Sequence, residues 1–310
     1  MSSVAVVGAG AMGGLWAALL EAAGQEVTIV DPSVELIDAV RRHGLSLVEA
    51  DGTVRRARPT AVLRASEAAP ADVVFVFVKG PHTRAVAEHL DGLLHDETIV
   101  TSLQNGWGNA DVLAEQVAPE RIVMGVTFHS ATIEAAGRIR HGGSGLTALG
   151  PYVDDAGLGT AEQVAAVMRT AGFECEVRTD VKTAVWMKLI HNAACLPVSA
   201  LTGLLAAQLV EAGPWRDLID ALAREAVAVA RAVGHEIDPD ERIEHIHRVL
   251  GSAGPGVPSM LADVRARRPT EIETINGAIV REARDHGLRV PLNESMVALV
   301  RGLERTWQGS

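Results

Sequence analysis

The strongest constraint on the fold lies in the first 31 residues. A short apolar run, Val4-Ala-Val-Val7, leads directly into Gly8-Ala-Gly-Ala-Met-Gly13 and then into an apolar stretch that continues to Ala23. A buried strand, a glycine-rich turn and a helix in that order open a βαβ unit, and Glu26–Val30 supplies its second strand. The chain therefore begins as an α/β fold with a parallel sheet.

The glycine-rich turn has the spacing that binds a dinucleotide. Gly8 permits the tight turn, Gly10 lets the backbone approach a pyrophosphate, and Gly13 permits close packing of helix on strand. With Ala11 and Met12 these residues open a helix whose free N–H groups and positive dipole end favour phosphates. We expect all five to line a cofactor site.

The choice between NAD and NADP depends on the end of the second strand. Asp31 stands where a carboxylate accepts hydrogen bonds from the ribose hydroxyls and repels a 2′-phosphate. Arg41 and Arg42 lie at the far end of the next predicted helix, so NAD is favoured over NADP. Lys79, just after the strand ending at Val78, is either a phosphate ligand or a solvated lysine, and the sequence leaves both open.

Beyond residue 31 the chain continues to alternate between strands and helices, and this alternation ends near residue 180. Further strands are predicted at residues 73–78, 99–102 and 122–126, with antiparallel strands over 137–150 closing the sheet. From about residue 180 the pattern is helical, with helices predicted at 181–199, 215–233, 239–250, 259–267 and 270–286. We predict a Rossmann-type, doubly wound parallel sheet over residues 1–179 and an all-helical substrate and catalytic domain over 180–310.

Composition removes several classes of function. The net charge of −11 argues against a nucleic-acid partner. The N-terminus lacks the basic segment of a signal peptide and is interrupted by glycines, so we expect a cytoplasmic protein without a membrane partner. Cys175 and Cys195 are expected to be free thiols. His235-Glu236 is followed by Pro239 where a zinc-protease helix needs its second histidine, and no metal site is predicted.

Three polar segments are not explained by packing. Asn105, in Leu103-Gln-Asn-Gly, is either a turn residue or an amide presented at the nicotinamide edge of the sheet, where it would contact the cofactor. Lys188 and Asn192 share one face of an apolar helix, where a lysine is costly unless it reaches solvent or has a role. The third segment runs from Ser259 through Asp263 to Thr270-Glu271. Each segment alone is compatible with ordinary surface residues and caps.

Together these segments resemble the ketopantoate reductase family over nearly the whole chain. The ordered set comprises the glycine turn, Val78-Lys79 with Thr83, Leu-Gln-Asn-Gly ending at Gly106, Trp186-x-Lys-Leu with Asn192, and Ser259-Met-Leu-x-Asp through Thr270-Glu-Ile to Asn276-Gly277. The resemblance implies a nicotinamide-dependent oxidoreductase that interconverts 2-oxo and 2-hydroxy acids.

The resemblance also implies roles for individual residues. Lys188 would protonate the ketone as hydride arrives, and Glu271 would hold the ketone or its associated water and orient the lysine. Asn105 and Ser259 would position the substrate, Asn192 would bind a substrate oxygen, and Asp263 would tie helices together. The chemistry is sound because a cationic donor stabilises the negative charge that develops on the ketone oxygen. Burial lowers the pKa of such a lysine, whereas Glu271 acts in the opposite direction.

Two departures from the family bear on the substrate and the cofactor. Family members usually carry an asparagine just before the proline of this helix, and this chain has Leu196 before Pro197. Many members favour NADP, but Asp31 favours NAD. The hypothesis is therefore an NAD-linked 2-hydroxy-acid dehydrogenase, acting on 2-dehydropantoate or on a more apolar 2-oxo acid that contacts Leu196.

Alternatives stay open at this point. A 3-hydroxy-acid dehydrogenase or an imine reductase joins a similar cofactor domain to helices, but the Ser259 to Glu271 segment argues against both. A cofactor-sensing protein without turnover has no need for Lys188, Asn105, Ser259 and Glu271 together. The apolar helices at 181–199 and 218–233 need cover, which makes a homodimer through the helical domain possible.

Overall fold

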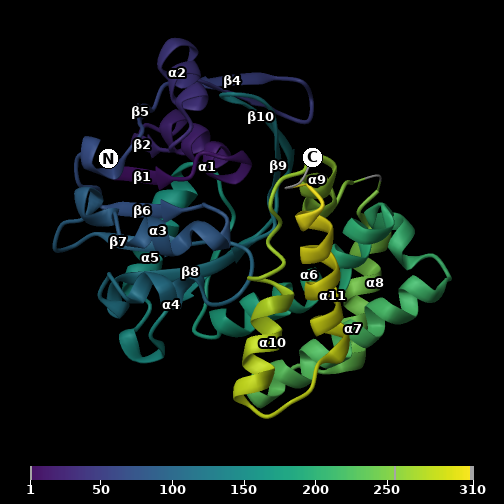
Figure 1. Cartoon of the computed structure of the whole chain (residues 1–310). Helices are drawn as coiled ribbons and strands as arrows, with labels where there is room; N and C mark the ends of the chain where they lie inside the picture. Colours follow the sequence, from purple (N-terminus) through teal and green to yellow (C-terminus); the bar gives the residue numbers. More distant parts are fainter. Residues whose placement is uncertain (1, 255, 308–310) are drawn as a thin grey trace. The chain divides into compact units, whose positions relative to one another are not determined.

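The structure is a computed structural model that describes residues 2–254 and 256–307 (Figure 1). It divides into two compact units. The first contains Met1–Gln104 and Asn109–Ala184, and the second contains Val185–Ser310 together with the short segment Asn105–Gly108.

The first unit is built on an eight-stranded sheet, in agreement with the predicted α/β class (Figure 1). Its strands, in spatial order, are β12 (Cys175–Val177), β11 (Thr147–Pro151), β8 (Ile122–Thr127), β7 (Ile99–Ser102), β6 (Val73–Val76), β1 (Ser3–Val7), β2 (Glu26–Val30) and β5 (Thr60–Val62). The six strands from β8 to β5 are parallel. All four residues of β6 are buried, as expected of a strand covered on both faces. The strand order reverses between β1 and β6, where open α/β sheets bind ligands.

A second, four-stranded sheet corrects one prediction. It contains β4 (Val54–Ala57), β3 (Leu45–Val48), β10 (Arg138–Gly143) and β9 (Ser130–Ala135). Residues 137–150 were expected to close the main sheet, but only β11 does so, antiparallel to β8. The reason lies in burial: β11 is buried throughout, whereas β10 alternates between exposed and buried residues and cannot occupy a sheet covered on both faces.

Helix α1 (Ala11–Ala22) packs against both sheets of the first unit. This explains why it is apolar on nearly every side, since a helix with no solvent face needs no polar stripe. Trp16 is fully buried in it and stacks on Phe173 with ring centroids 4.4 Å apart. The remaining helices of this unit are α2 (Val34–His43), α3 (Thr83–Ala87), α4 (Asn109–Ala114) and α5 (Gly159–Thr170).

The second unit is helical, as predicted (Figure 1). It contains α7 (Pro214–Ala232), α8 (Pro239–Ser252), α9 (Ser259–Arg265), α10 (Asn276–Asp285), α11 (Pro291–Arg305) and most of α6 (Val181–Thr202). By length and composition α6 could cross a membrane, but 72% of its apolar window is buried inside the protein. A buried central helix of this kind passes the same test, and α6 contributes a large share of the core of this unit.

Two helix predictions differ from the structure. The helix expected at 270–286 begins only at Asn276, and α11 was not anticipated. Residues 271–275 form turns instead, with the Glu271 carbonyl accepting hydrogen bonds from the backbone N–H groups of Thr274 and Ile275. The Thr270 hydroxyl accepts from the Ile272 N–H, and such local side-chain bonds compete with a helix. Glu271 therefore lies on a turn.

Candidate functional site

The glycine turn of the first unit has the geometry of a phosphate-binding loop. Gly8 has a φ of 88°, and a Cβ atom at Gly13 would lie 1.9 Å from the Gly8 carbonyl oxygen, so neither position accommodates a side chain. Gly10 borders open space, since a Cβ atom there would meet nothing within 4 Å. Gly10 also precedes α1 without a capping side chain, which leaves the first N–H groups of the helix available to an anion.

Asp31 is tied directly to this turn. Its Oδ2 accepts a hydrogen bond from the Ala9 N–H at 2.9 Å, and its Oδ1 accepts one from the Ser33 N–H at 2.9 Å. A carboxylate has about four acceptor positions, so roughly two remain after these bonds are made. The arrangement fits a nicotinamide dinucleotide, with the pyrophosphate on the turn and the ribose hydroxyls on Asp31.

Two cations, Arg41 and Lys79, bear on phosphate binding at this edge of the sheet. The Arg41 Nε donates to the Ala61 carbonyl at 2.9 Å, so this guanidinium is engaged within the fold. Lys79 follows β6, and because β6 is parallel to β1 it lies at the same edge of the sheet as the glycine turn. The structure therefore places Lys79 where a phosphate ligand would stand, and its role stays a prediction.

Gln104 is a residue that the sequence interpretation left without a role. Its Nε2 donates to the Val78 carbonyl at 2.7 Å and to the Thr83 hydroxyl at 2.8 Å, and its Oε1 accepts from the Ser102 hydroxyl at 2.9 Å. These bonds join the carboxyl ends of β6 and β7. The signal in the sequence is a polar residue two positions after the end of a buried strand.

In the second unit, α6 carries three predicted site residues at intervals of four. Lys188, Asn192 and Leu196 therefore project from one face of the helix. Asn192 and Leu196 are each only 8% exposed. In the described part of the chain the Asn192 amide makes no hydrogen bond, which leaves its donor and acceptor groups available to a ligand.

Lys188 has an unusual acidity. Burial lowers the pKa of its ammonium from an ordinary value of 10.5 to about 8, and the negative charge of Glu271 acts in the opposite direction. Lys188 and Glu271 therefore lie close enough to interact, although they are far apart in the sequence. A lysine with this pKa exchanges its proton near neutral pH, which is the property required of a general acid.

Asn105 belongs to the same unit as Lys188 and Glu271. The Asn105 Nδ2 donates to the Glu271 Oε2 at 3.1 Å. Beside it, a Cβ atom at Gly106 would lie 2.2 Å from the Thr274 carbonyl oxygen, so only glycine permits this approach. The Trp107 N–H donates to that same carbonyl at 3.0 Å. The Asn105–Gly108 segment is thus fixed against the turn that carries Glu271.

The side chain of Trp107 also holds the Asn105–Gly108 segment in place, and the sequence had not indicated this role. Its indole Nε1 donates to the Glu282 Oε1 at 2.9 Å, and its ring lies 5.3 Å from that of Trp186. The indicative signal was a large aromatic residue directly after Asn-Gly, where a plain turn would carry a small or polar residue.

Ser259 and Asp263 occupy different environments. Ser259 is exposed at the first position of α9, and the structure leaves its predicted role untested. Asp263 is buried, and its Oδ1 accepts from the Arg268 Nε at 3.2 Å. It therefore joins α9 to the segment that follows.

Cys175 and Cys195 are both free thiols, as expected. Within residues 2–254 and 256–307, no three histidine, cysteine or acidic side chains gather as metal ligands.

Comparisons with known proteins establish the family of the chain. The family model described as Ketopantoate reductase PanE/ApbA matches residues 4–154, and its C-terminal counterpart matches residues 180–304. The 2-dehydropantoate 2-reductase of Halobacterium salinarum is 35% identical over 304 residues, covering 97% of this chain and 99% of its own. The enzyme of that name from Archaeoglobus fulgidus is 32% identical over 304 residues, covering 97% of each chain.

Solved structures extend the comparison to the fold. A D-mandelate dehydrogenase in complex with NADH and anilino(oxo)acetate superposes with a TM-score of 0.93 at 26% identity, covering 99% of each chain. A ketopantoate reductase of Ralstonia eutropha superposes with a TM-score of 0.89 at 30% identity, covering 98% of this chain and 99% of its own. The chain therefore belongs to the ketopantoate reductase family of nicotinamide-dependent oxidoreductases.

Proposed function

We propose that this protein reduces a 2-oxo acid to a 2-hydroxy acid with NADH, and that Lys188 is the general acid. The observation that carries the proposal is the partly buried ammonium of Lys188, whose pKa of about 8 allows it to donate a proton near neutral pH. The nicotinamide supplies the hydride when the cofactor is bound. Lys188 transfers its proton to the ketone oxygen as negative charge develops there.

Neighbouring residues prepare Lys188 and hold the substrate. Glu271 keeps the lysine protonated to a higher pH than burial alone permits. It also accepts a hydrogen bond from Asn105, which fixes the direction of that amide toward the substrate. In this proposal the Asn192 amide donates to a substrate oxygen, and Ser259 lies near the carboxylate of the substrate.

The cofactor preference follows from Asp31. A 2′-phosphate carries a negative charge that this carboxylate repels, whereas ribose hydroxyls satisfy its remaining acceptor positions. The D-mandelate dehydrogenase relative was solved with NADH, which supports the same choice.

The substrate preference follows from Leu196. This side chain stands eight residues after Lys188 on the same face of α6 and is buried and apolar. We propose that it contacts the side chain of the 2-oxo acid and favours an apolar group over a hydroxyl. The anilino(oxo)acetate bound to the D-mandelate dehydrogenase carries an aromatic group, which fits this proposal. The curated relatives favour 2-dehydropantoate itself as the second candidate.

A turnover assay decides between the two candidates. Purified protein is given NADH or NADPH with 2-dehydropantoate, with phenylglyoxylate and with branched aliphatic 2-oxo acids, and kcat/KM is measured for each pair. We expect the highest value for NADH with an apolar 2-oxo acid. Highest efficiency for NADPH with 2-dehydropantoate would contradict the interpretation of both Asp31 and Leu196. Absence of turnover with every pair would direct attention to an imine substrate.

A matched variant tests the role of Asp31 separately. Asp31→Asn keeps an oxygen that can accept from the Ala9 N–H but removes the negative charge. We expect the NADH to NADPH preference to fall by roughly tenfold to a hundredfold, the effect of losing hydrogen bonds to a charged group. An unchanged preference would show that another residue selects the cofactor.

A further inference from the structure

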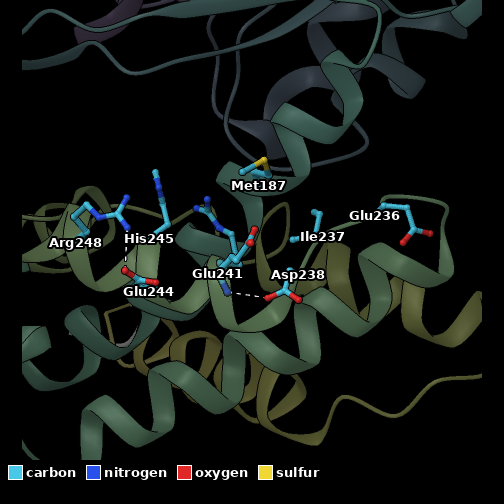
Figure 2. Close-up of a pocket in the computed structure, with 9 residues that line it drawn as sticks. Met187, Glu236, Ile237, Asp238, Glu241, Glu244, His245 and Arg248 are labelled. Carbon is cyan, nitrogen blue, oxygen red and sulfur yellow. Dashed lines mark hydrogen bonds and ion pairs between the residues drawn. The ribbon is translucent and has the colours of Figure 1, made fainter.

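A cavity of about 370 Å³ lies within the helical unit, apart from the residues assigned above. Met187 of α6 forms one side, and the 236–238 segment with the first turns of α8 forms the other (Figure 2). Neither Lys188 nor Glu271 is among the described residues that line it. His245 and Arg248 lie toward one end of the cavity and Glu236 toward the other (Figure 2).

Arg242 is the unusual residue in this lining. It is only 5% exposed, and its Nε is buried without a hydrogen-bond partner. In the described part of the chain its side chain makes no hydrogen bond or ion pair. Along α8 it is followed at intervals of four by Ile246 and Leu250, which are both buried, so the guanidinium occupies a position on the apolar face of the helix.

This buried charge persists at neutral pH. Burial lowers the pKa of Arg242 only to about 10, so the guanidinium remains protonated. An unpaired buried cation is unfavourable, and an anion that reaches it removes much of that cost. A charge of this kind in the wall of a cavity is therefore an attachment point for an anionic ligand.

The other ionisable groups around Arg242 do not neutralise it. Burial, reinforced by the charge of Arg242, lowers the pKa of His191 to about 3 and also lowers that of His245, so both are neutral at pH 7. Glu244 pairs with Arg248 at 3.2 Å. Asp238 caps α8 by accepting from the N–H groups of residues 240 and 241.

The lining also limits which anion fits. Glu236, Asp238, Glu241 and Glu244 all contribute to it, and together they repel a ligand that carries several negative charges. A single carboxylate matches the planar fork of a guanidinium through two parallel hydrogen bonds.

We propose that this cavity binds a small monocarboxylate, whose carboxylate pairs with Arg242. The histidines at 191 and 245 supply neutral hydrogen-bonding groups nearby, and the acidic residues of the lining exclude multiply charged oxyanions such as phosphate. The site does not depend on the proposed reaction, so it is tested by binding and not by turnover.

Thermal unfolding of the full-length protein measures this binding. Propionate is titrated as the monocarboxylate, propionamide as its neutral isostere, and inorganic phosphate as the multiply charged anion, all at ionic strength matched with sodium chloride. Ligand at ten times its Kd is expected to raise Tm by about 2–5 °C. We expect this rise with propionate alone. Equal shifts with propionate and propionamide, or a larger shift with phosphate, would overturn the proposal.

Three variants locate the binding at Arg242. Arg242→Met removes the charge and should abolish the propionate shift. Arg248→Met removes a side chain that is 67% exposed and already paired, and should keep the shift. Glu241→Gln removes one repelling charge and should strengthen propionate binding by about twofold to fivefold. A propionate shift that survives in Arg242→Met contradicts the assignment, and the propionate–propionamide difference in the unaltered protein remains decisive if that variant does not fold.

Discussion

Lys188 and Arg242 are two cations of the helical unit whose pKa values are both lowered by burial. Only one of them can lose its proton near neutral pH. Burial lowers the pKa of Lys188 from 10.5 to about 8 and that of Arg242 from 12.5 to about 10. Glu271 lies close enough to Lys188 to oppose the shift, whereas in the described chain no carboxylate pairs with Arg242. The lysine can therefore release its proton near neutral pH, and the arginine cannot.

The difference shows how a buried charge acquires a role. A buried amine whose pKa lies near neutral pH can lose its proton, which removes the cost of keeping a charge away from water. The same readiness to release a proton allows it to act as a general acid. A guanidinium keeps its charge and can be relieved only by an anion. Where the protein supplies no such anion, a ligand is the remaining source. The comparison predicts that removing Lys188 affects chemistry and that removing Arg242 affects stability and binding.

Lys188→Ala is expected to give the largest effect. Loss of a general acid lowers the rate by roughly 100-fold to 10,000-fold, and the change should appear in kcat because proton donation occurs in the transition state. Steady-state kinetics measure the rate, and fluorescence titration with NADH measures cofactor binding, which should be retained.

The matched control for this variant is Lys182→Ala on the same helix. The Lys182 ammonium pairs with Asp154 at 3.0 Å near the start of α6 and has no predicted catalytic role. A fall in kcat of similar size in both variants would mean that α6 had been perturbed as a whole, and would remove the support for Lys188 as the acid.

Glu271→Gln is expected to have a smaller effect with a distinctive pH signature. Glu271 raises the pKa of Lys188, so its neutralisation should lower that pKa below about 8. Because the protonated lysine is the active form in reduction, the rate falls as pH rises through the pKa, and this fall should begin at lower pH in the variant. An interaction of about 1.5–3 kcal/mol with Glu271 corresponds to a fall of the pKa to about 6–7, so at pH 7.5 we expect the rate to decrease by roughly threefold to twenty-fivefold. Gln keeps an oxygen for the Asn105 amide, so an unchanged pH profile would show that Glu271 acts on Asn105 alone.

The sequence predicted the cofactor unit well because its signals are local. A strand, a glycine turn and a helix follow one another within 20 residues, and Gly13 has a direct steric cause in the Gly8 carbonyl. At 137–150 the sequence assigned both antiparallel strands to the main sheet, but only β11 enters it, and β10, with its different burial pattern, joins the second sheet. Which sheet a strand enters depends on its partner strands, and β3, the parallel partner of β10, lies about 90 residues earlier in the sequence.

The site in the helical unit was only partly accessible for the same reason. The spacing of Lys188, Asn192 and Leu196 on α6 was visible in the sequence. The approach of Asn105 to Glu271 was not, because 166 positions separate the two residues and the glycine between Asn105 and Trp107 reads as an ordinary turn. Arg242 belongs to none of the sequence motifs that pointed to the site. Its significance comes from an apolar helix face that only the packed structure reveals.

The smallest predicted effect tests the unpaired charge of Arg242 most directly, because it concerns the protein without any ligand. Arg242→Met replaces an unpaired buried guanidinium by an apolar side chain of similar length, and should raise the free energy of unfolding by about 1 kcal/mol. Arg248→Met should change it by less, since that side chain is mostly exposed and its pairing with Glu244 contributes little. Chemical denaturation in buffer without carboxylates measures both values. A less stable Arg242→Met protein would show that the guanidinium already has a partner within the fold, whereas a more stable one would mean that the chain keeps a destabilising charge, as expected of a residue retained for binding.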